Sequence, residues 1–539
     1  MQRQSKKMWF TIFGLALGIL IGIYIQPLIS GDSIYEQLNK FKDVLFTVEK
    51  NYVDDVNTPE LVESAIAGML TKLDPHSVYI PAEQQRRVEE DFRGSFEGIG
   101  VEFDVIRDTI TVVASISGGP SEALGIISGD KIVRIDGQSA VGMDRSDVPN
   151  KLRGKKGSKV NVSIMRPGGT EPLEFTITRD EIPLYTVDAS FVDENGTGYM
   201  KINRFADPTY TEMVEHLEKL SSAGMKRLIL DLRGNPGGYL ERAVRMADEF
   251  IGGKQKIVYT ESARNNDEEV FWSHNGQNYE EVPLIVLVSP GSASASEIMA
   301  GAIQDLDRGL IVGETTFGKG LVQKQFSLSD GSAFRLTVAR YYTPSGRLIQ
   351  RPYDSGLESY YALAGRDEGE EGANIDHNHD TKDTSRPTYK TLGGRMVIGG
   401  GGITPDYIVK PDTLHSKSGS WDIITKNVTW EYVEGYMATN GASLRSRYQN
   451  NFGSFLNGYE VTEGMFQDFL NMSRKKGIKI DDELIKADTP LLKNRIKSRI
   501  ARSIWGDTEF YQVALQADKQ YKKALTLFPE AQKIASRTK

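Results

Sequence analysis

Two short blocks of residues combine a serine and a lysine in a way that could hydrolyse a peptide bond. The first block, residues 291–297 (GSASASE), follows the apolar run 283–289 and leads into the helix-like run 297–306. A strand, a turn of small residues and a helix would present a serine hydroxyl beside helix N-terminal N–H groups, which can hold an oxyanion. The second block, residues 316–323 (TFGKGLVQ), places Lys319 among glycines and apolar residues. Poor solvation there favours a neutral amine, which could serve as the base toward a serine.

Other hydrolytic chemistries find little support in the sequence. The chain has no cysteine, which excludes a thiol nucleophile, a disulfide framework and a thiolate metal site. It has no G-x-S-x-G pentapeptide, and its six histidines lie in no recognisable triad context. One cluster has the residue types of a metal site: Asp376, His377, His379 and Asp380. It lies in a polar, acidic stretch, which favours a solvated loop, so neither a metal nor an organic cofactor is predicted.

The two blocks and their spacing resemble the signature of the carboxy-terminal processing proteases, also called tail-specific proteases, which carry SASASE followed by FGKG-x-x-Q. The resemblance implies that Ser294 is the nucleophile, that Lys319, 25 positions further on, is the base, and that Gln323 orients the lysine. Residues four apart lie on one side of a helix or a strand, so Gln323 can reach Lys319 in either.

Each of these residues also has a purely structural interpretation. The serine block could be a turn in which Ser294 or Ser296 caps a helix. Lys319 alone is typical of a solvated loop, and Gln323 alone is an ordinary strand residue. Their joint occurrence at the family's spacing favours catalysis.

A third block, residues 231–238 (DLRGNPGG), follows the apolar strand-like run 227–232. In the family it resembles, this loop supplies one oxyanion N–H group, and we predict Gly238 as that donor, with Gly237 as the near alternative. The second predicted donor is the N–H group of Ala295, next to the nucleophile. Without the resemblance, a Gly-Gly pair after a strand is more often only a turn.

Residues 94–182 resemble a PDZ domain, through the glycine patterns FEGIGV at 96–101 and GDKIVRIDG at 129–137. N–H groups of the first pattern can capture a peptide's terminal carboxylate while the next strand adds the peptide as a further strand. The family also has an arginine that couples the PDZ position to the protease, although a plain surface arginine is equally consistent here. The predicted peptide-binding residues are Gly98, Ile99, Gly100, Val101, Phe103 and Arg153.

The N-terminus indicates the compartment. Arg3, Lys6 and Lys7 precede an uncharged, largely apolar run at residues 8–29. As a helix, this run spans about 33 Å, roughly the hydrocarbon thickness of a bilayer, and positive charge before it directs the rest of the chain outward. No small-x-small cleavage site follows, so we expect an uncleaved single-pass anchor at residues 1–30 and a catalytic part on the periplasmic or extracytoplasmic side.

The predicted fold class is multidomain α/β, with a helical segment, a PDZ β-barrel, an α/β protease core built on a mixed sheet and a helical C-terminal extension after the transmembrane helix. The core departs from the family pattern by an acidic insert at about 351–398, and the extension is the second departure. The predicted boundaries are 1–30, 33–93, 94–182, 183–412 and 413–539.

The net charge of −8 comes mostly from residues 354–383, which alone carry −7. Nothing in this charge distribution indicates a nucleic-acid partner. The predicted function is a serine endopeptidase that selects proteins by their free, apolar C-terminal tails. A second copy, through residues 38–52, and a regulatory partner at the insert or extension are candidate partners. For residues 38–52, burial of the apolar face inside the monomer is equally consistent. The alternatives are a PDZ-based scaffold with a dead hydrolase site and a partner-gated protease with little basal activity. The intact Ser294–Lys319 pair argues against the scaffold.

Overall fold

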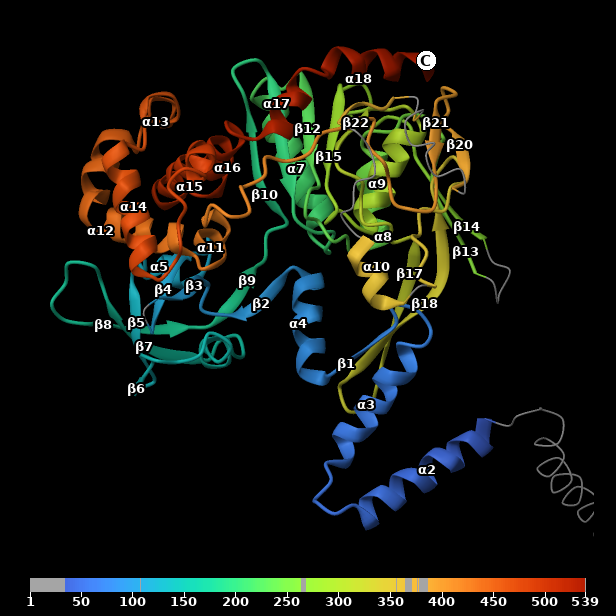
Figure 1. Ribbon diagram of the computed structural model, residues 1–539, viewed down its shortest axis with the longest axis horizontal. Coiled ribbons are helices and arrows are strands. Elements are labelled where there is room, and N and C mark those ends of the chain that lie inside the picture. Colours follow the sequence, from blue (N-terminus) through green and yellow to red (C-terminus); the bar gives the residue numbers. More distant parts are fainter. Residues whose placement is uncertain are drawn as a thin grey trace, which may run out of the picture. The chain divides into compact units, whose positions relative to one another are not determined.

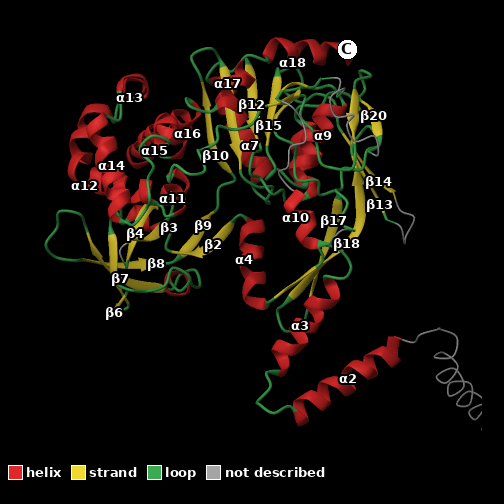
Figure 2. Ribbon diagram, viewed as in Figure 1, coloured by secondary structure: helices red, strands yellow, loops and turns green. Residues whose placement is uncertain are grey.

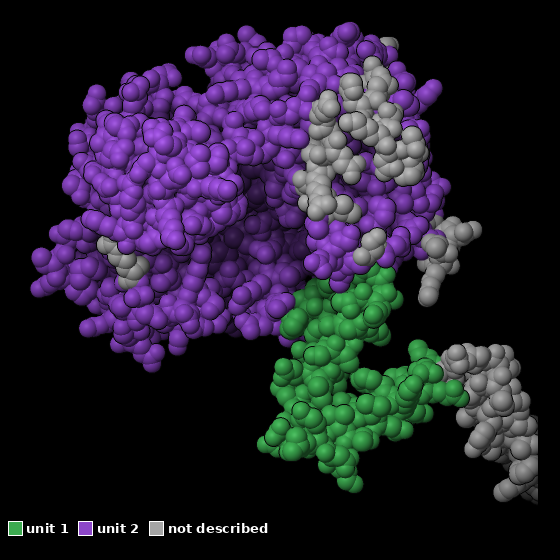
Figure 3. Space-filling model, in the orientation of Figure 1, with its two compact units in different colours: residues 1–81 green, residues 82–539 purple. Residues whose placement is uncertain are grey.

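The structure, a computed structural model, describes residues 34–106, 108–262, 268–354, 356–363, 371–375, 377 and 386–538. The chain has two compact units, residues 1–81 and 82–539 (Figure 3). The predicted membrane segment, residues 1–30, lies outside the described residues. Within the residues that are described, no helix is both long enough and apolar enough to cross a membrane.

The first unit contains helices α2 (Ile34–Asn51) and α3 (Thr58–Leu70) and the short strand β1 (Val78–Ile80). α3 begins at the N-cap residue Asn57, whose side chain accepts a hydrogen bond from the Glu60 N–H group at 3.4 Å. α2 has no buried residue, and most of its apolar side chains, Leu38 and Phe41 among them, are exposed.

The protease core of the second unit is built on a seven-stranded mixed sheet, which confirms the predicted α/β class (Figures 1 and 2). Five strands run parallel in its centre, and a strand at each end is antiparallel to its neighbour. In sheet order they are β10 (Val187–Val192), β11 (Thr197–Ile202), β12 (Arg227–Asp231), β15 (Leu284–Val288), β16 (Leu310–Gly313), β22 (Tyr407–Ile408) and β19 (Gly372–Ala373).

The central strands read as continuous apolar runs because helices cover both faces of this sheet. Leu228 and Leu230 of β12 face one layer of helices, whereas Ile229 faces the other. The first layer is α7 (Thr209–Ser222), α8 (Leu240–Asp248) and α9 (Ala295–Asp305). The second comes from the end of the chain: α16 (Asp507–Leu515), α17 (Lys519–Leu525) and α18 (Phe528–Ala535).

A second sheet of the core carries the continuation of the lysine block. β17 (Leu321–Ser327) pairs antiparallel with β18 (Ala333–Tyr342), which pairs with β13 (Lys256–Glu261), and β13 pairs with β14 (Glu268–Trp272). The insert contributes helix α10 (Leu357–Leu363) and the small hairpin of β20 (Thr388–Lys390) and β21 (Met396–Ile398).

The segment predicted as a PDZ domain follows helix α4 (Ala82–Arg93) and forms a six-stranded sheet around its own apolar core. The main strand order is β3 (Val101–Ile106), β4 (Thr109–Ser115), β5 (Lys131–Ile135), β7 (Lys159–Met165) and β8 (Leu173–Thr178), with β6 (Gln138–Ser139) beside β5. Helices α5 (Pro120–Ala123) and α6 (Val148–Leu152) complete it. β2 (Ser95–Gly98) pairs antiparallel with β9 (Asp180–Pro183), which brings the two ends of the segment together.

The C-terminal extension is helical, as predicted. Five helices share one core: α11 (Ser420–Thr425), α12 (Val428–Tyr448), α13 (Phe452–Gly458), α14 (Glu463–Lys475) and α15 (Ile485–Ile504). This helical bundle also contacts the PDZ sheet. Arg502 forms an ion pair with Glu102 at 2.8 Å, and Trp430 packs with Ile106 and Val113.

Candidate active site

The three predicted catalytic blocks lie at the same edge of the core sheet. The oxyanion block (residues 231–238) begins at the end of β12, the serine block (291–297) follows β15 and the lysine block (316–323) follows β16. These strands are parallel neighbours, so their carboxyl ends meet where an open α/β sheet usually places its ligand site.

Ser294 lies at the turn between β15 and α9, where it is the N-cap residue of the helix. Its backbone has a φ of 55° and a ψ of −113°, a conformation that non-glycine residues rarely adopt and that is frequent at functional sites. The turn is held on both sides, because Ser292 Oγ donates to the Leu232 carbonyl at 2.8 Å and Ser296 Oγ donates to the Asn235 carbonyl at 2.9 Å. The predicted strand–turn–helix arrangement is therefore present, and Ser294 does occupy a cap position.

The oxyanion block packs directly against this turn. A Cβ atom on Gly237, whose φ is +96°, would lie 2.6 Å from the Ala293 carbonyl oxygen and 2.9 Å from Ser294 Cβ. The Gly237 N–H group donates to Asn235 Oδ1 at 2.9 Å and is engaged within the block. Gly238 therefore stays the predicted donor of the two. Ala295 is the first residue of α9, and the first N–H groups of a helix have no partner within it.

Lys319 lies just before β17, and its Nζ donates to Gln323 Oε1 at 2.7 Å. The predicted lysine–glutamine contact is thus present, with Gln323 on β17. The aromatic ring of Phe317 packs edge-on against Tyr360 of α10, with ring centroids 5.8 Å apart, so the insert supports the lysine block. Gln350 contributes a further contact, since its Oε1 accepts from the Gly320 N–H group at 2.8 Å.

A fully buried carboxylate, Glu297, joins the serine block to the lysine block. Its Oε2 accepts the N–H groups of Ser294 at 2.8 Å and Lys319 at 2.9 Å. Its Oε1 accepts the Thr316 hydroxyl at 2.6 Å and the Gly318 N–H group at 2.7 Å. Burial raises the pKa of Glu297 from 4.5 to about 7, while these four hydrogen bonds favour the ionised form and oppose the shift.

Tyr341 provides a second link between the same blocks. Its hydroxyl lies 2.6 Å from the Lys319 carbonyl oxygen and 3.1 Å from the Ser294 carbonyl oxygen. The side chain is buried, and burial raises the pKa of Tyr341 well above its ordinary value, so the hydroxyl stays protonated. The structure thus brings Ser294 and Lys319 together through their main chains.

Sequence reasoning identified neither Glu297 nor Tyr341 as part of the site. For Glu297 a signal was present, because Ser294 to Glu297 has the S-x-x-E spacing of a capping box. For Tyr341 no local pattern distinguishes it from the other residues of β18.

The predicted peptide-binding residues are spread over the start of the PDZ sheet. Gly98 ends β2, Val101 begins β3, and Ile99 and Gly100 connect the strands. Val101 and Phe103 pack partly buried against the PDZ core, whereas Ile99 is buried within it at 2% exposure. The Ile99 carbonyl is held by the Ser121 hydroxyl at 2.6 Å.

Arg153 lies at the end of α6 and contacts two residues near the entry to the PDZ sheet. It forms an ion pair with Glu90 of α4, and its guanidinium lies over the Phe96 ring, 4.4 Å from the centroid. These contacts join the end of α6 to α4, the helix before the PDZ segment, and to β2. The predicted coupling of PDZ position to the protease stays a prediction.

The interpretation of His377 as part of a solvated loop is wrong. The residue is 1% exposed and its Nε2 lies 3.8 Å from Asp406 Oδ1, beside the ion pairs of Arg395 with Asp307 and Asp406. Arg395 holds the pKa of Asp406 well below its usual range despite burial. This part of the insert is therefore anchored in the core. Asp376, His379 and Asp380 lie outside the described residues.

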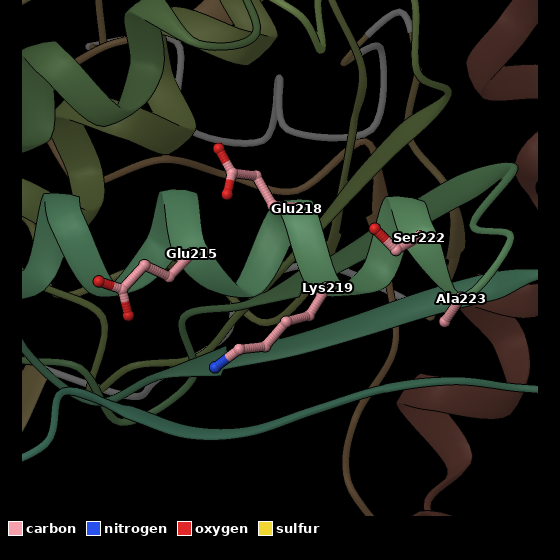
Figure 4. Close-up of a pocket in the computed structure, with 5 residues that line it drawn as sticks. All are labelled: Glu215, Glu218, Lys219, Ser222 and Ala223. Atoms are coloured by element: carbon pink, nitrogen blue, oxygen red, sulfur yellow. The ribbon is translucent and has the colours of Figure 1, made fainter.

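A surface hollow of about 660 Å³ lies over the second half of α7 (Figure 4). It is lined by Glu215, Glu218, Lys219, Ser222 and Ala223 and by none of the predicted site residues. Its side chains are charged or small and come from one helix, so it offers no second candidate for the active site.

Family models match four parts of the chain: peptidase family S41 over residues 196–358, a PDZ domain over 98–178, the activating protease CtpB N-terminal domain over 27–84, and a family of unknown function, DUF8443, over 422–506. The chain is 36% identical over 351 residues to a carboxy-terminal-processing protease of Bartonella bacilliformis, covering 64% of this chain and 80% of the relative. It is 35% identical over 361 residues to the carboxy-terminal processing protease CtpA of Bacillus subtilis, covering 65% and 76%.

Among solved structures, a photosystem II D1 C-terminal processing protease is 29% identical, with a TM-score of 0.33 over 61% of this chain and 97% of that one. The sequence matches put the chain in the class of PDZ-containing serine peptidases. It belongs to the carboxy-terminal processing protease family, which confirms the family expected from the sequence.

The raised pKa of Glu297 makes stability depend on pH. Its protonation stabilises the folded state fully below pH 4.5, and this contribution is lost as the pH rises through about 7. Between these pH values, we expect the free energy of unfolding of the wild type to fall by up to about 3 kcal/mol more than that of Glu297→Gln. Urea unfolding at stepped pH measures the difference. Glu218→Gln, at an exposed position of α7, is the control that should follow the wild type, and parallel curves for Glu297→Gln would contradict the prediction.

Gly237→Ala tests the packing of the oxyanion block on the serine turn. The added Cβ would meet the Ala293 carbonyl at 2.6 Å, on a backbone with φ of +96°. We expect a loss of about 2 kcal/mol of stability and of most peptidase activity. Gly234→Ala, also at positive φ but with no atom within 4 Å of the new Cβ, should cost less. Equal effects of the two substitutions would show that close packing is not the cause.

Proposed function

We propose that the chain is a serine endopeptidase of the C-terminal processing type that works through a Ser294–Lys319 dyad. The observation that carries the proposal is the pair of links between the two blocks: Glu297 accepts both main-chain N–H groups, and the Tyr341 hydroxyl reaches both carbonyls. A lysine held beside a serine at a helix N-terminus suits general-base activation of a hydroxyl.

In the proposed mechanism, neutral Lys319 accepts the proton of Ser294 Oγ as this oxygen attacks the carbonyl carbon of a peptide bond. The carbonyl oxygen becomes an oxyanion held by the N–H groups of Ala295 and Gly238. Lys319 then donates the proton to the leaving amine, and water hydrolyses the acyl-enzyme with Lys319 again as base. Gln323 keeps the amine oriented, in line with its 2.7 Å contact to Lys319 Nζ.

We assign substrate selection to the PDZ domain. β3 is the last strand at one side of its sheet, and the strand order leaves one of its edges available to a peptide strand. The loop from Gly98 to Val101 would hold the terminal carboxylate, and Val101 and Phe103 would contact the last apolar side chain. Proteins with free apolar C-termini are therefore the proposed substrates.

The location and assembly of the enzyme are proposed from the sequence. Arg3, Lys6 and Lys7 before the apolar run 8–29 favour an extracytoplasmic catalytic part. Protease digestion of spheroplasts, in which any outer barrier is already open, checks this, because a catalytic part that is cut only after the cytoplasmic membrane is permeabilised would contradict it. The exposed apolar side chains of α2 favour a homodimer, and sedimentation of Leu38→Glu against the wild type tests that contact.

The dyad is tested by cleavage of an unfolded reporter protein with an apolar C-terminal tail, using residues 31–539. We expect Ser294→Ala and Lys319→Arg each to lower kcat by at least about a thousandfold, because alanine removes the nucleophile and a guanidinium stays protonated. Lys324→Arg, an exposed neighbour on β17, is the matched control and should keep full activity. Cleavage that survives Ser294→Ala would exclude the mechanism.

Tail selection is tested with the same reporter ending in an amidated or a charged tail. We expect kcat/KM to fall by about tenfold or more, because the terminal carboxylate or the apolar last side chain loses its PDZ contact. Direct binding of the tail peptides measures the same preference apart from chemistry. Cleavage that ignores the tail would keep the protease and remove the selection step, whereas tail binding without any cleavage would favour the scaffold or a partner-gated enzyme.

A further inference from the structure

The C-terminal extension reaches the oxyanion block through one partly buried arginine, Arg233. Arg233, the third residue of the block, donates from Nη1 to Asp518 Oδ2 at 2.7 Å and to Gln520 Oε1 at 2.8 Å. Its Nε and Nη2 donate to the carboxylate of Asp231, at the end of β12. The guanidinium is thus held between the core sheet on one side and the start of α17 on the other.

The guanidinium of Arg233 contacts one carboxylate of the core and a second one from the extension. Asp231 is 1% exposed and is contacted by two cations, Arg233 and Lys201, and by the Tyr199 hydroxyl at 2.7 Å. The two cations hold the pKa of Asp231 well below its usual range despite burial. Asp518 supplies the second carboxylate that contacts this guanidinium. Without it, Arg233 would keep only Asp231, which it shares with Lys201.

Asp518 and Gln520 are themselves fixed in place. Asp518 is the N-cap residue of α17, and its Oδ1 accepts the Tyr521 N–H group at 2.8 Å. The Gln520 amide donates to the Val409 carbonyl, just after β22, at 2.7 Å. Tyr521 packs edge-on against Tyr199 of β11, with ring centroids 5.7 Å apart. The start of α17 is therefore a rigid part of the sheet's outer layer.

The position of Arg233 determines where the next residues of the block lie. Its carbonyl accepts a hydrogen bond from Lys201 Nζ, and the following Gly234 N–H group donates to Ser289 Oγ at 3.0 Å. The Asn235 carbonyl then accepts the Ala293 N–H group at 3.0 Å, one residue before Ser294. These contacts connect Arg233, through Gly234 and Asn235, to the turn that carries Ser294.

We propose that Asp518 and Gln520 are positioning residues for the oxyanion block, so that the C-terminal extension completes the active site of the core. This inference rests on the proposed function, because it concerns the same oxyanion donors. Both residues lie outside the parts of the chain that the four family models match. They act through Arg233 and have no contact with substrate in this assignment.

Asp518→Asn removes the charge and leaves a side chain that can still cap α17. In the reporter assay with residues 31–539, we expect kcat to fall by about tenfold with KM unchanged, because the oxyanion is stabilised mainly in the transition state. Affinity for a peptide aldehyde, which forms a tetrahedral adduct with the serine, should fall by the same factor. Asp518→Glu should restore part of both. Lys519→Gln breaks only the exposed ion pair with Glu371 and should resemble the wild type.

The possible outcomes separate the inference from the function on which it rests. An Asp518→Asn variant with wild-type kcat and aldehyde affinity would overturn the inference alone. A wild type that ignores the aldehyde, or cleavage retained by Ser294→Ala, would overturn the proposed function and the inference with it. If Asp518→Asn does not fold, Gln520→Ala replaces it, with an expected threefold to fivefold loss, on the order of one hydrogen bond, in kcat and aldehyde affinity. A change in KM alone, or an equal loss of kcat and aldehyde affinity in Lys519→Gln, would also overturn the inference.

Discussion

The buried carboxylate of Glu297 is the interaction on which the arrangement of this site depends. It accepts hydrogen bonds from main-chain N–H groups of both the serine and the lysine blocks, which follow different strands of the sheet. Burial penalises the charged form and raises the pKa of Glu297 to about 7, and four hydrogen bonds offset part of that cost. The same contacts hold the two blocks together.

The core sheet explains why these blocks meet at all. Parallel strands β12, β15 and β16 end at one edge, so three segments far apart in sequence converge without a long loop. Helices on both faces hold the strands rigidly in register, one layer from within the core and the other from the end of the chain. The outer layer is a structural part of the core sheet, because its side chains fill the apolar face around Ile229 and Ile285.

Much of this could be predicted from the sequence, because strand-end motifs are local patterns. Ser294, Lys319, Gln323 and the glycine pair were predicted because their blocks and spacing resemble the family's signature, and the alternation of strand-like and helix-like segments indicated the α/β class. Contacts between distant segments carry no such pattern, so the Arg233–Asp518 pair, separated by 285 residues, was not predictable. The prediction for His377 failed for a related reason: its acidic neighbours in the sequence indicated a solvated loop, whereas in the fold the residue is buried beside Asp406, outside that stretch.

The PDZ sheet is not an independent module in this protein, because it packs against the helical bundle. Ile106 and Val113 form an apolar spot on the PDZ surface, and Trp430 of α12 covers it while Arg502 pairs with Glu102. A PDZ fragment limited to residues 94–182 would expose Ile106 and Val113 to water. The measured solubility and tail affinity of such a fragment would then reflect an exposed apolar surface that the intact protein does not have. The natural unit for dissection is the PDZ sheet together with its helical cover.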